Sequence, residues 1–362
     1  MIMAVRCRPC FLPEWAQRTV KLIIQIPCLN EAEHLPRTLA DLPREVPGFD
    51  AVEWLVIDDG SSDATAEVAK ANGTDHLVRL SYNHGLARAF MAGLEAALRA
   101  GADVIVNTDA DNQYDASCVL DLVRPIVEGK ALIVVGARPI ADIRHFSLMK
   151  RLLQRLGSWV VRIASGTDIP DATSGFRAIH RDAALRLYVF NSFTYTLETI
   201  IQAGRKDIPI VSVPIRINGE TRPSRLFASI PGYVWRSIVT IVRIALLYRP
   251  LRMFTLLAGL IALPGLVAIG RFLYFYYGGD GGGHIQSLAI AGALISVAAI
   301  VAIGGLLADL IAANRILLED IRARQFADTL RRRAGDFGAS KAATKRSGDV
   351  IFARGKRHAK TG

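Results

Sequence analysis

The feature that most constrains the fold is a repeated pattern of short apolar segments that end in polar and acidic residues. The segments cover residues 22–26, 54–57 and 104–108, and helical periodicity follows the first two. A further short strand is predicted at residues 76–80, with a long helix after it at residues 86–98. Strands that alternate with helices through short loops favour a mostly parallel, doubly wound α/β sheet. The polar residues would then gather at the carboxyl ends of the strands, where open α/β sheets bind ligands.

The triplet Asp109-Ala110-Asp111 follows one of these strands and is the strongest candidate metal site. Asp-x-Asp alone is common in turns, so its position after a buried-looking strand carries the argument. Mg2+ and Mn2+ take oxygen ligands and bind between one or two carboxylates and the phosphates of a substrate. Asp58 and Asp59 hold the matching place after another strand. Four acids at buried strand ends therefore predict a divalent metal and a nucleotide diphosphate.

Five motifs in this order resemble those of family 2 glycosyltransferases with a GT-A fold, and within them the polyprenyl-phosphate glycosyltransferases. They lie at residues 27–31 (PCLNE), 58–63 (DDGSSD), 109–113 (DADNQ), 136–138 (GAR) and 171–177 (DATSGFR). The resemblance covers about residues 20–230, and the ordered set is more specific than any single motif. It implies an inverting enzyme that transfers a sugar from a UDP- or GDP-sugar.

The resemblance also implies a role for individual residues. The nucleotide-sugar would be held by Pro27, Asn30, Glu31, Asp58, Asp59, Asp109 and Ala110. The metal would be held by Asp109, Asp111 and Gln113. The catalytic set would be Asp109, Asp111, Arg138 and Asp171.

An acceptor phosphate is already anionic at neutral pH, so it needs positioning more than a general base. Arg138, Arg222 and Arg225 are the residues expected to bind it. Arg225 stands where the family often carries Lys, and its guanidinium favours bidentate phosphate contact. The alternative is a solvated basic loop near an anionic membrane.

Three other acids are expected to have no catalytic role. Asp63 and Asp115 suit helix caps or turns. Glu198 lies on a predicted amphipathic helix, where a lone Glu usually faces solvent.

The chain becomes apolar after residue 225. Residues 226–250 mix apolar residues with arginines and predict an interfacial amphipathic helix. Residues 253–270 and 287–308 contain no charged side chain, and a bilayer core needs about 20 apolar residues per helix. We therefore expect transmembrane helices at residues 251–277 and 285–313. The alternative is two buried helices of a soluble core.

Arginines flank the outer ends of both predicted spans. This predicts that the catalytic domain and both termini lie on the cytoplasmic face, which is the inner membrane if the protein is bacterial. Residues 321–362 hold 12 Lys or Arg and 3 Asp, so most of the formal charge of +11 belongs to a basic tail that we expect to be disordered. No nucleic-acid partner is expected. In the N-terminal extension, residues 1–19, we expect no secretory signal, and we expect no zinc site at Cys7 and Cys10, because no second Cys pair or nearby His accompanies them.

Three classes of function are compatible with these features. The favoured class is a membrane-anchored glycosyltransferase that uses a polyprenyl phosphate as acceptor and Mg2+ or Mn2+ as cofactor. The second is a glycosyltransferase of the same fold acting on a glycan, a glycolipid or a protein. The third is a non-catalytic membrane scaffold, which would not need the motifs. Association into homo-oligomers through the membrane helices is a further possibility that the sequence does not decide.

Overall fold

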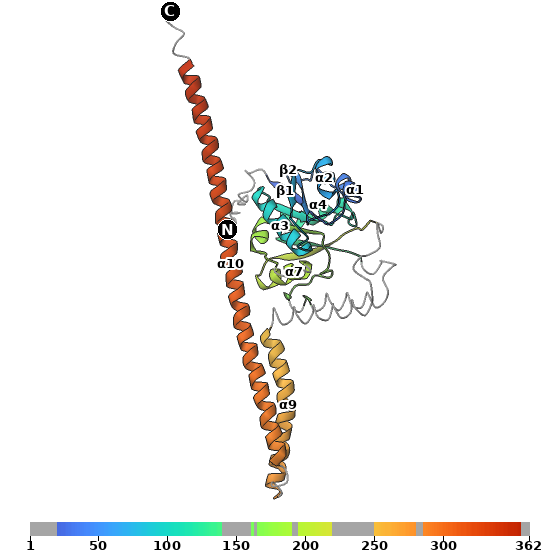
Figure 1. The fold of residues 1–362 in the computed structure, drawn as a ribbon, viewed down its shortest axis with the longest axis vertical. Coiled ribbons are helices and arrows are strands. Elements are labelled where there is room, and N and C mark those ends of the chain that lie inside the picture. Colours follow the sequence, from blue (N-terminus) through green and yellow to red (C-terminus); the bar gives the residue numbers. More distant parts are fainter. Residues whose placement is uncertain are drawn as a thin grey trace, which may run out of the picture.

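The computed structural model describes residues 20–139, 161–162, 165–189, 195–218, 250–279 and 285–355, with side chains as far as residue 332. An α/β domain is followed by two long helices, α9 (Pro250–Tyr277) and α10 (Ile285–Gly355) (Figure 1). The expected N-terminal extension and nearly all of the expected interfacial helix lie outside the described residues.

The α/β domain is built on one seven-stranded sheet in the order β3-β2-β1-β4-β6-β5-β7. All neighbouring strands are parallel except where β6 pairs with β4 and β5. The strands are β1 (Lys21–Cys28), β2 (Ala51–Asp58), β3 (His76–Arg79), β4 (Val104–Asn107), β5 (Ile133–Ala137), β6 (Arg177–His180) and β7 (Ile210–Pro214). The prediction of a mostly parallel, doubly wound sheet is confirmed.

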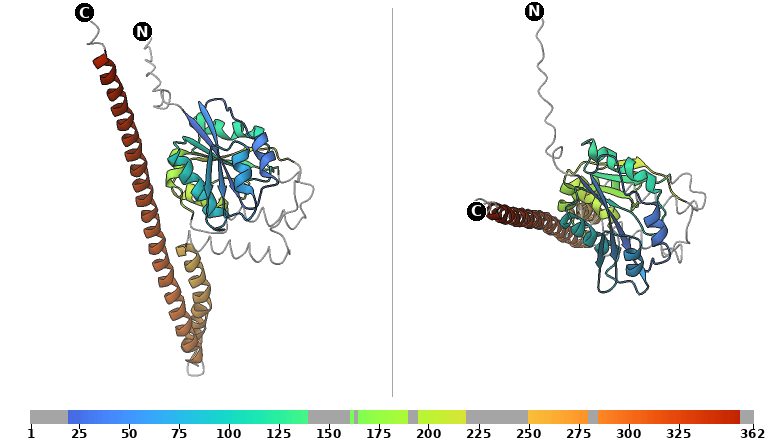
Figure 2. Two further views of the ribbon diagram at one scale, coloured as in Figure 1. Left: turned by 45° about the horizontal axis from the view of Figure 1, so that its top comes forward. Right: turned by 90° about the horizontal axis from the view of Figure 1, so that it is seen from above.

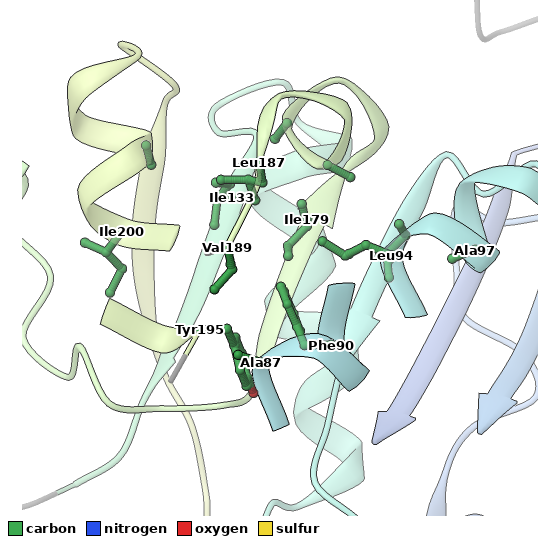
Figure 3. Close-up of a cluster of buried hydrophobic side chains, with 14 of the residues drawn as sticks. Ala87, Phe90, Leu94, Ala97, Ile133, Ile179, Leu187, Val189, Tyr195 and Ile200 are labelled. Carbon is green, nitrogen blue, oxygen red and sulfur yellow. The ribbon is translucent and has the colours of Figure 1, made fainter. Parts of the chain in front are cut away.

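Helices cover both faces of the sheet, as the two further views in Figure 2 show. They are α1 (Leu35–Asp41), α2 (Thr65–Ala71), α3 (Leu86–Arg99), α4 (Val119–Val127), α6 (Arg181–Arg186) and α7 (Thr196–Arg205). Side chains alternate along each strand, so Ile23 packs with α3, α6 and α7, whereas Leu22 and Ile24 pack with α1, α2 and α4. Figure 3 shows the first of these layers, in which the rings of Phe90 and Tyr195 stack at 4.0 Å.

The strand register brings the predicted motifs to one edge of the sheet. Gln25 of β1 lies opposite Asn107 of β4, and Cys28 lies opposite Asp58 of β2. Pro27 is the last residue but one of β1. The loops after β1, β2 and β4 therefore begin at the same carboxyl edge, where the sequence predicts the site.

Helices α9 and α10 run antiparallel to each other with glycines at their contact. A Cβ built on Gly265 would lie 3.3 Å from the Cβ of Leu294, and one built on Gly305 would lie 2.4 Å from the Cβ of Phe254. Both helices are long and apolar enough to cross a membrane, and most of their apolar side chains are exposed. That exposure argues against two buried helices of a soluble core.

The C-terminal part of α10 differs from the expectation of a disordered tail. The helix continues to Gly355, whereas the sequence led us to expect disorder from residue 321 onward. Arg and Ala are strong helix formers, and Arg324 pairs with Asp320 one turn earlier at 2.8 Å. Phe326 and Leu330 also pack against the α/β domain, which the charge count of this segment did not reveal.

Candidate active site

Hydrogen bonds join the loops after β1 and β2. The Asn30 backbone N–H donates to Ser61 Oγ (2.9 Å), and Asn30 Oδ1 accepts from the Ser62 N–H (2.8 Å). Asn30 has a φ of 55°, a left-handed conformation that Asn tolerates better than most residues. The Glu31 N–H donates to Thr65 Oγ1 (2.9 Å). The predicted nucleotide-binding residues are thus set in place by contacts inside the protein.

Asp63 and Asp115 have structural roles. Asp63 accepts from the N–H groups of Thr65 (3.0 Å) and Ala32 (3.1 Å), so it connects the start of α2 to the β1 loop. Asp115 accepts from the Ser117 N–H (2.9 Å) and caps a short 3-10 helix. These contacts agree with the expectation that both are cap or turn residues.

The two acids at the end of β2 have different surroundings. Asp58 is fully buried, and its Oδ2 lies 3.3 Å from Nε of Arg79. The Asp59 oxygens accept from the N–H groups of His84 (2.8 Å) and Gly85 (2.9 Å), which holds the loop before α3 against this edge. Each carboxylate oxygen can accept more than one hydrogen bond, so these internal contacts leave Asp59 able to accept one from a nucleotide. Nucleotide binding by Asp59 stays a prediction.

Asp109 and Asp111 lie directly beyond β4 at the same edge. Burial and the neighbouring Asp111 raise the pKa of Asp109 to about 6, although Arg138, a hydrogen bond from Tyr114 and Arg177 act in the opposite direction. A carboxyl group with this pKa is held in a place that disfavours its own charge. The positive charges of Arg138 and Arg177 therefore offset only part of the effect of burial and of Asp111.

The rest of the DADNQ motif is fixed by its neighbours. The Ala110 carbonyl accepts from Thr38 Oγ1 (2.7 Å), and the Gln113 N–H donates to Asp111 Oδ1 (3.1 Å). Asn218 donates its own N–H to the Gln113 carbonyl at 2.9 Å. Asn218 is the last described residue before the segment that carries the predicted acceptor residues Arg222 and Arg225, which lie outside the described part of the chain.

Gly175 packs directly against Asp109. A Cβ on Gly175 would lie 3.0 Å from both Asp109 oxygens and 2.9 Å from the Tyr195 hydroxyl. The Gly175 N–H donates to Tyr114 Oη (3.1 Å), and its carbonyl accepts from Asn107 Nδ2 (2.9 Å). Only a glycine allows the 171–177 loop to approach the metal motif this closely.

Arg138 and Asp171 form a two-point ion pair. Asp171 accepts from Nε (2.7 Å) and Nη2 (3.0 Å) of Arg138, and Nη2 also donates to Thr173 Oγ1 (2.8 Å). The pKa of Asp171 is lowered, because the Arg138 contacts outweigh the opposing effect of burial. A carboxylate so stabilised is a poor proton acceptor, so Asp171 suits the orientation of Arg138 better than general-base catalysis.

Sequence reasoning missed the role of Arg177, the last residue of the predicted motif at residues 171–177. Its side chain is fully buried and donates to the carbonyls of Ser174 (2.8 Å), Ala172 (3.0 Å) and Thr196 (2.8 Å). Among the described residues, no carboxylate lies within ion-pair distance of it. Burial lowers its pKa to about 10. The motif signalled a loop near the site, but not that its arginine points into the core.

Sequence reasoning was wrong about Glu198. It is 5% exposed, and its Oε1 accepts from Arg315 of α10 at 2.8 Å. Helical periodicity alone cannot show that a distant segment covers a helix face.

The two carboxylates fit a divalent cation whose remaining ligands come from a substrate and water. In the part of the chain that the structure describes, no group of three or more His, Cys, Asp or Glu side chains gathers. Asp109 and Asp111 provide two carboxylates, and burial together with the charge of Asp111 raises the pKa of Asp109. Mg2+ and Mn2+ commonly use one or two carboxylates and take further oxygens from phosphates and water.

Comparison with known proteins identifies the family of this chain. The family description "Glycosyl transferase family 2" matches residues 23–187. An uncharacterised glycosyltransferase of Mycobacterium tuberculosis is 30% identical over 213 residues, which are 58% of this chain and 92% of that protein. The chain therefore belongs to glycosyl transferase family 2, and it is a transferase.

Two further proteins are similar to this chain. The undecaprenyl-phosphate mannosyltransferase of Micrococcus luteus is 29% identical over 235 residues, covering 62% of this chain and 93% of the relative. The crystal structure of glucosyl-3-phosphoglycerate synthase from Mycobacterium tuberculosis with Mn2+, UDP and product has 20% identity and a TM-score of 0.48, over 64% of this chain and 80% of that one. The predicted class, a GT-A-like sheet followed by two apolar helices, is confirmed by the sheet order and the helices described above.

Proposed function

We propose that this protein transfers a sugar from a UDP- or GDP-sugar to a polyprenyl phosphate, with inversion and with Mg2+ or Mn2+ as cofactor. The observation that carries the proposal is the pair Asp109 and Asp111 at the carboxyl edge, where burial and mutual repulsion favour a bound cation. The similarity to an undecaprenyl-phosphate mannosyltransferase supports the choice of acceptor.

The donor would lie along the carboxyl edge of the sheet. Pro27, Asn30, Glu31, Asp58 and Asp59 would surround the nucleoside, because their loops begin beside the metal motif. Asp109 and Asp111, with Gln113, would hold the metal against the diphosphate. When bound, the metal neutralises negative charge on the leaving nucleoside diphosphate.

The acceptor phosphate would be positioned by Arg138, with Arg222 and Arg225 as further expected contacts. Its oxygen forms a bond to the anomeric carbon while the bond from that carbon to the donor's diphosphate breaks. The nucleoside diphosphate leaves with the electron pair, and attack from the opposite face inverts the anomeric centre. Asp171 orients Arg138 through two hydrogen bonds and takes no proton.

A lipid acceptor also accounts for the two apolar helices. We propose that α9 and α10 cross the membrane as a hairpin and keep the α/β domain at its cytoplasmic face. Support comes from their length and exposure, and from the arginines that flank the outer ends of the hairpin.

The test is transfer from a panel of radiolabelled UDP- and GDP-sugars to undecaprenyl or dolichyl phosphate in detergent, with and without EDTA. We expect lipid-extractable label from one donor, lost with EDTA. Asp111→Ala should abolish transfer, whereas Asp121→Ala should not, because Asp121 is an exposed acid on α4 and belongs to none of the predicted motifs. Donor consumption without labelled lipid would indicate a glycan, glycolipid or protein acceptor instead. Transfer by Asp111→Ala near the wild-type rate would refute the metal assignment.

A further inference from the structure

Helix α10 docks on the α/β domain through a balanced group of four buried or partly buried charges. Arg315 donates to Glu198 of α7 (2.8 Å) and to Glu319 one turn further along α10 (3.0 Å). Lys206, directly after α7, donates to Glu319 at 2.8 Å. Glu198 and Glu319 are 5% and 6% exposed. The two acids and the two bases compensate one another. Removing one of them would leave a buried charge without its partner, which strongly destabilises such a contact.

Three further turns of α10 continue this contact. The Arg322 guanidinium lies 3.9 Å from the ring centre of Tyr188. Phe326 and Leu330 pack against the layer formed by α3, α6 and α7. Figure 1 shows α10 running past this side of the domain after it leaves α9. The contact thus spans several turns of α10 and fixes its rotation about its own axis.

The first two turns of α7 also contact the active-site loop. Arg177 donates to the Thr196 carbonyl and to the Thr199 hydroxyl, and with its other N–H groups to the carbonyls of Ala172 and Ser174. Because this guanidinium is fully buried, moving α7 away would leave charged donors without partners. Helix α7 and the loop at residues 172–174 must therefore move together.

Tyr195, the residue before α7, completes the connection to the metal motif. Its hydroxyl accepts from Asn107 Nδ2 (2.9 Å), and Gly175 packs between this hydroxyl and Asp109. A displacement of the start of α7 would change the packing around Asp109.

We propose that Arg315 is a positioning residue: by holding Glu198 it fixes α7, and through Arg177 it fixes the loop beside Asp109. The active-site loop is then ordered only while α10 is docked. This links the apolar hairpin to the site by a defined chain of contacts. The effect on sugar transfer rests on the proposed function, but the effect on loop order does not.

The experiment is hydrogen–deuterium exchange of the full chain in detergent micelles, comparing wild type with Arg315→Met. We expect amides of residues 171–177 to exchange about tenfold faster or more in the variant, the effect of losing a charge-assisted hydrogen bond. Arg324→Met is the matched control, because Arg324 lies on the same helix but is exposed and pairs only locally with Asp320. It should leave exchange at residues 171–177 unchanged.

Unchanged exchange at residues 171–177 in Arg315→Met overturns the proposal, whether or not α10 itself loosens. Arg315→Lys keeps the charge but loses the guanidinium group, whose two nitrogens contact Glu198 and Glu319. It is therefore a milder variant if Arg315→Met fails to fold. For Arg315→Lys we expect an intermediate increase in exchange at residues 171–177, and exchange at the wild-type rate would count against the proposal. In the transfer assay, kcat should fall while KM for the donor changes little. If wild type transfers no sugar, the proposed function fails, and exchange at residues 171–177 still decides the role of Arg315.

Discussion

Replacing Asp109 by Asn is expected to stabilise the metal-free protein while it removes metal binding. The pKa of Asp109 rises from 3.8 to about 6, mainly through burial and the charge of Asp111. Since one pKa unit corresponds to about 1.4 kcal/mol, the ionised carboxylate costs the folded state about 3 kcal/mol. For a domain of about 200 residues, removing that cost should raise Tm by about 6 to 12 °C.

The pH dependence has a definite sign. Because the folded protein holds this proton more tightly than the unfolded chain, the contribution of Asp109 to stability is full only below its ordinary pKa of 3.8. It falls as pH rises toward 6 and is constant above that. The Tm difference between Asp109→Asn and wild type should therefore be full at pH 7.5 and vanish below pH 3.8.

The assay is thermal unfolding in detergent, followed by tryptophan fluorescence in EDTA and then with excess Mn2+. Wild type should gain stability from Mn2+ by mass action, whereas Asp109→Asn should not. Asp171→Asn is the control with the opposite sign, because Arg138 lowers the pKa of Asp171 and its stabilising effect is lost as pH falls. An Asp109→Asn protein that is no more stable than wild type at pH 7.5 in EDTA would refute the reasoning.

Three other substitutions test separate contacts. Gly175→Ala should reduce transfer at least tenfold with little change in expression, because its Cβ would lie 3.0 Å from the Asp109 carboxylate; wild-type kcat would contradict this. Arg138→Lys should raise KM for the lipid acceptor more than KM for the donor, since Lys cannot make the two-point contact with Asp171; equal changes in both KM values would contradict it. Gly305→Leu should lower Tm in detergent through a clash with Phe254, whereas Gly292→Leu, which has open space around it, should not; equal Tm changes would show that the hairpin is not packed as described.

The sheet and its edge could be predicted because they depend on short-range patterns. β1 and β4 are short, continuous apolar runs, which predict strands buried on both faces, and the structure packs Ile23 on one face and Leu22 on the other. Motifs placed directly after such strands must lie at the carboxyl edge. The position of Asp58 and Asp109 near one another follows from parallel pairing alone.

The contacts that order the site could not be predicted, because they join segments far apart in the chain. Arg177 resembles a surface residue at the start of a strand, yet its partners lie in a tight loop and in α7. Glu198 and Arg315 are separated by 117 residues and by the whole apolar hairpin. Neither residue has a local pattern that distinguishes a buried ion pair from a solvated side chain.

Charge distribution explains why such buried contacts are needed. The metal-free site places Asp109 beside Asp111, and burial gives Asp109 too little water to stabilise its charge. Repulsion of this kind favours a proton or a cation beside Asp109. Arg177 provides positive charge within the core and, at the same time, binds the loop to α7. The same arrangement that makes the site ready for a cation therefore makes its geometry depend on α7, and on the helix α10 that covers it.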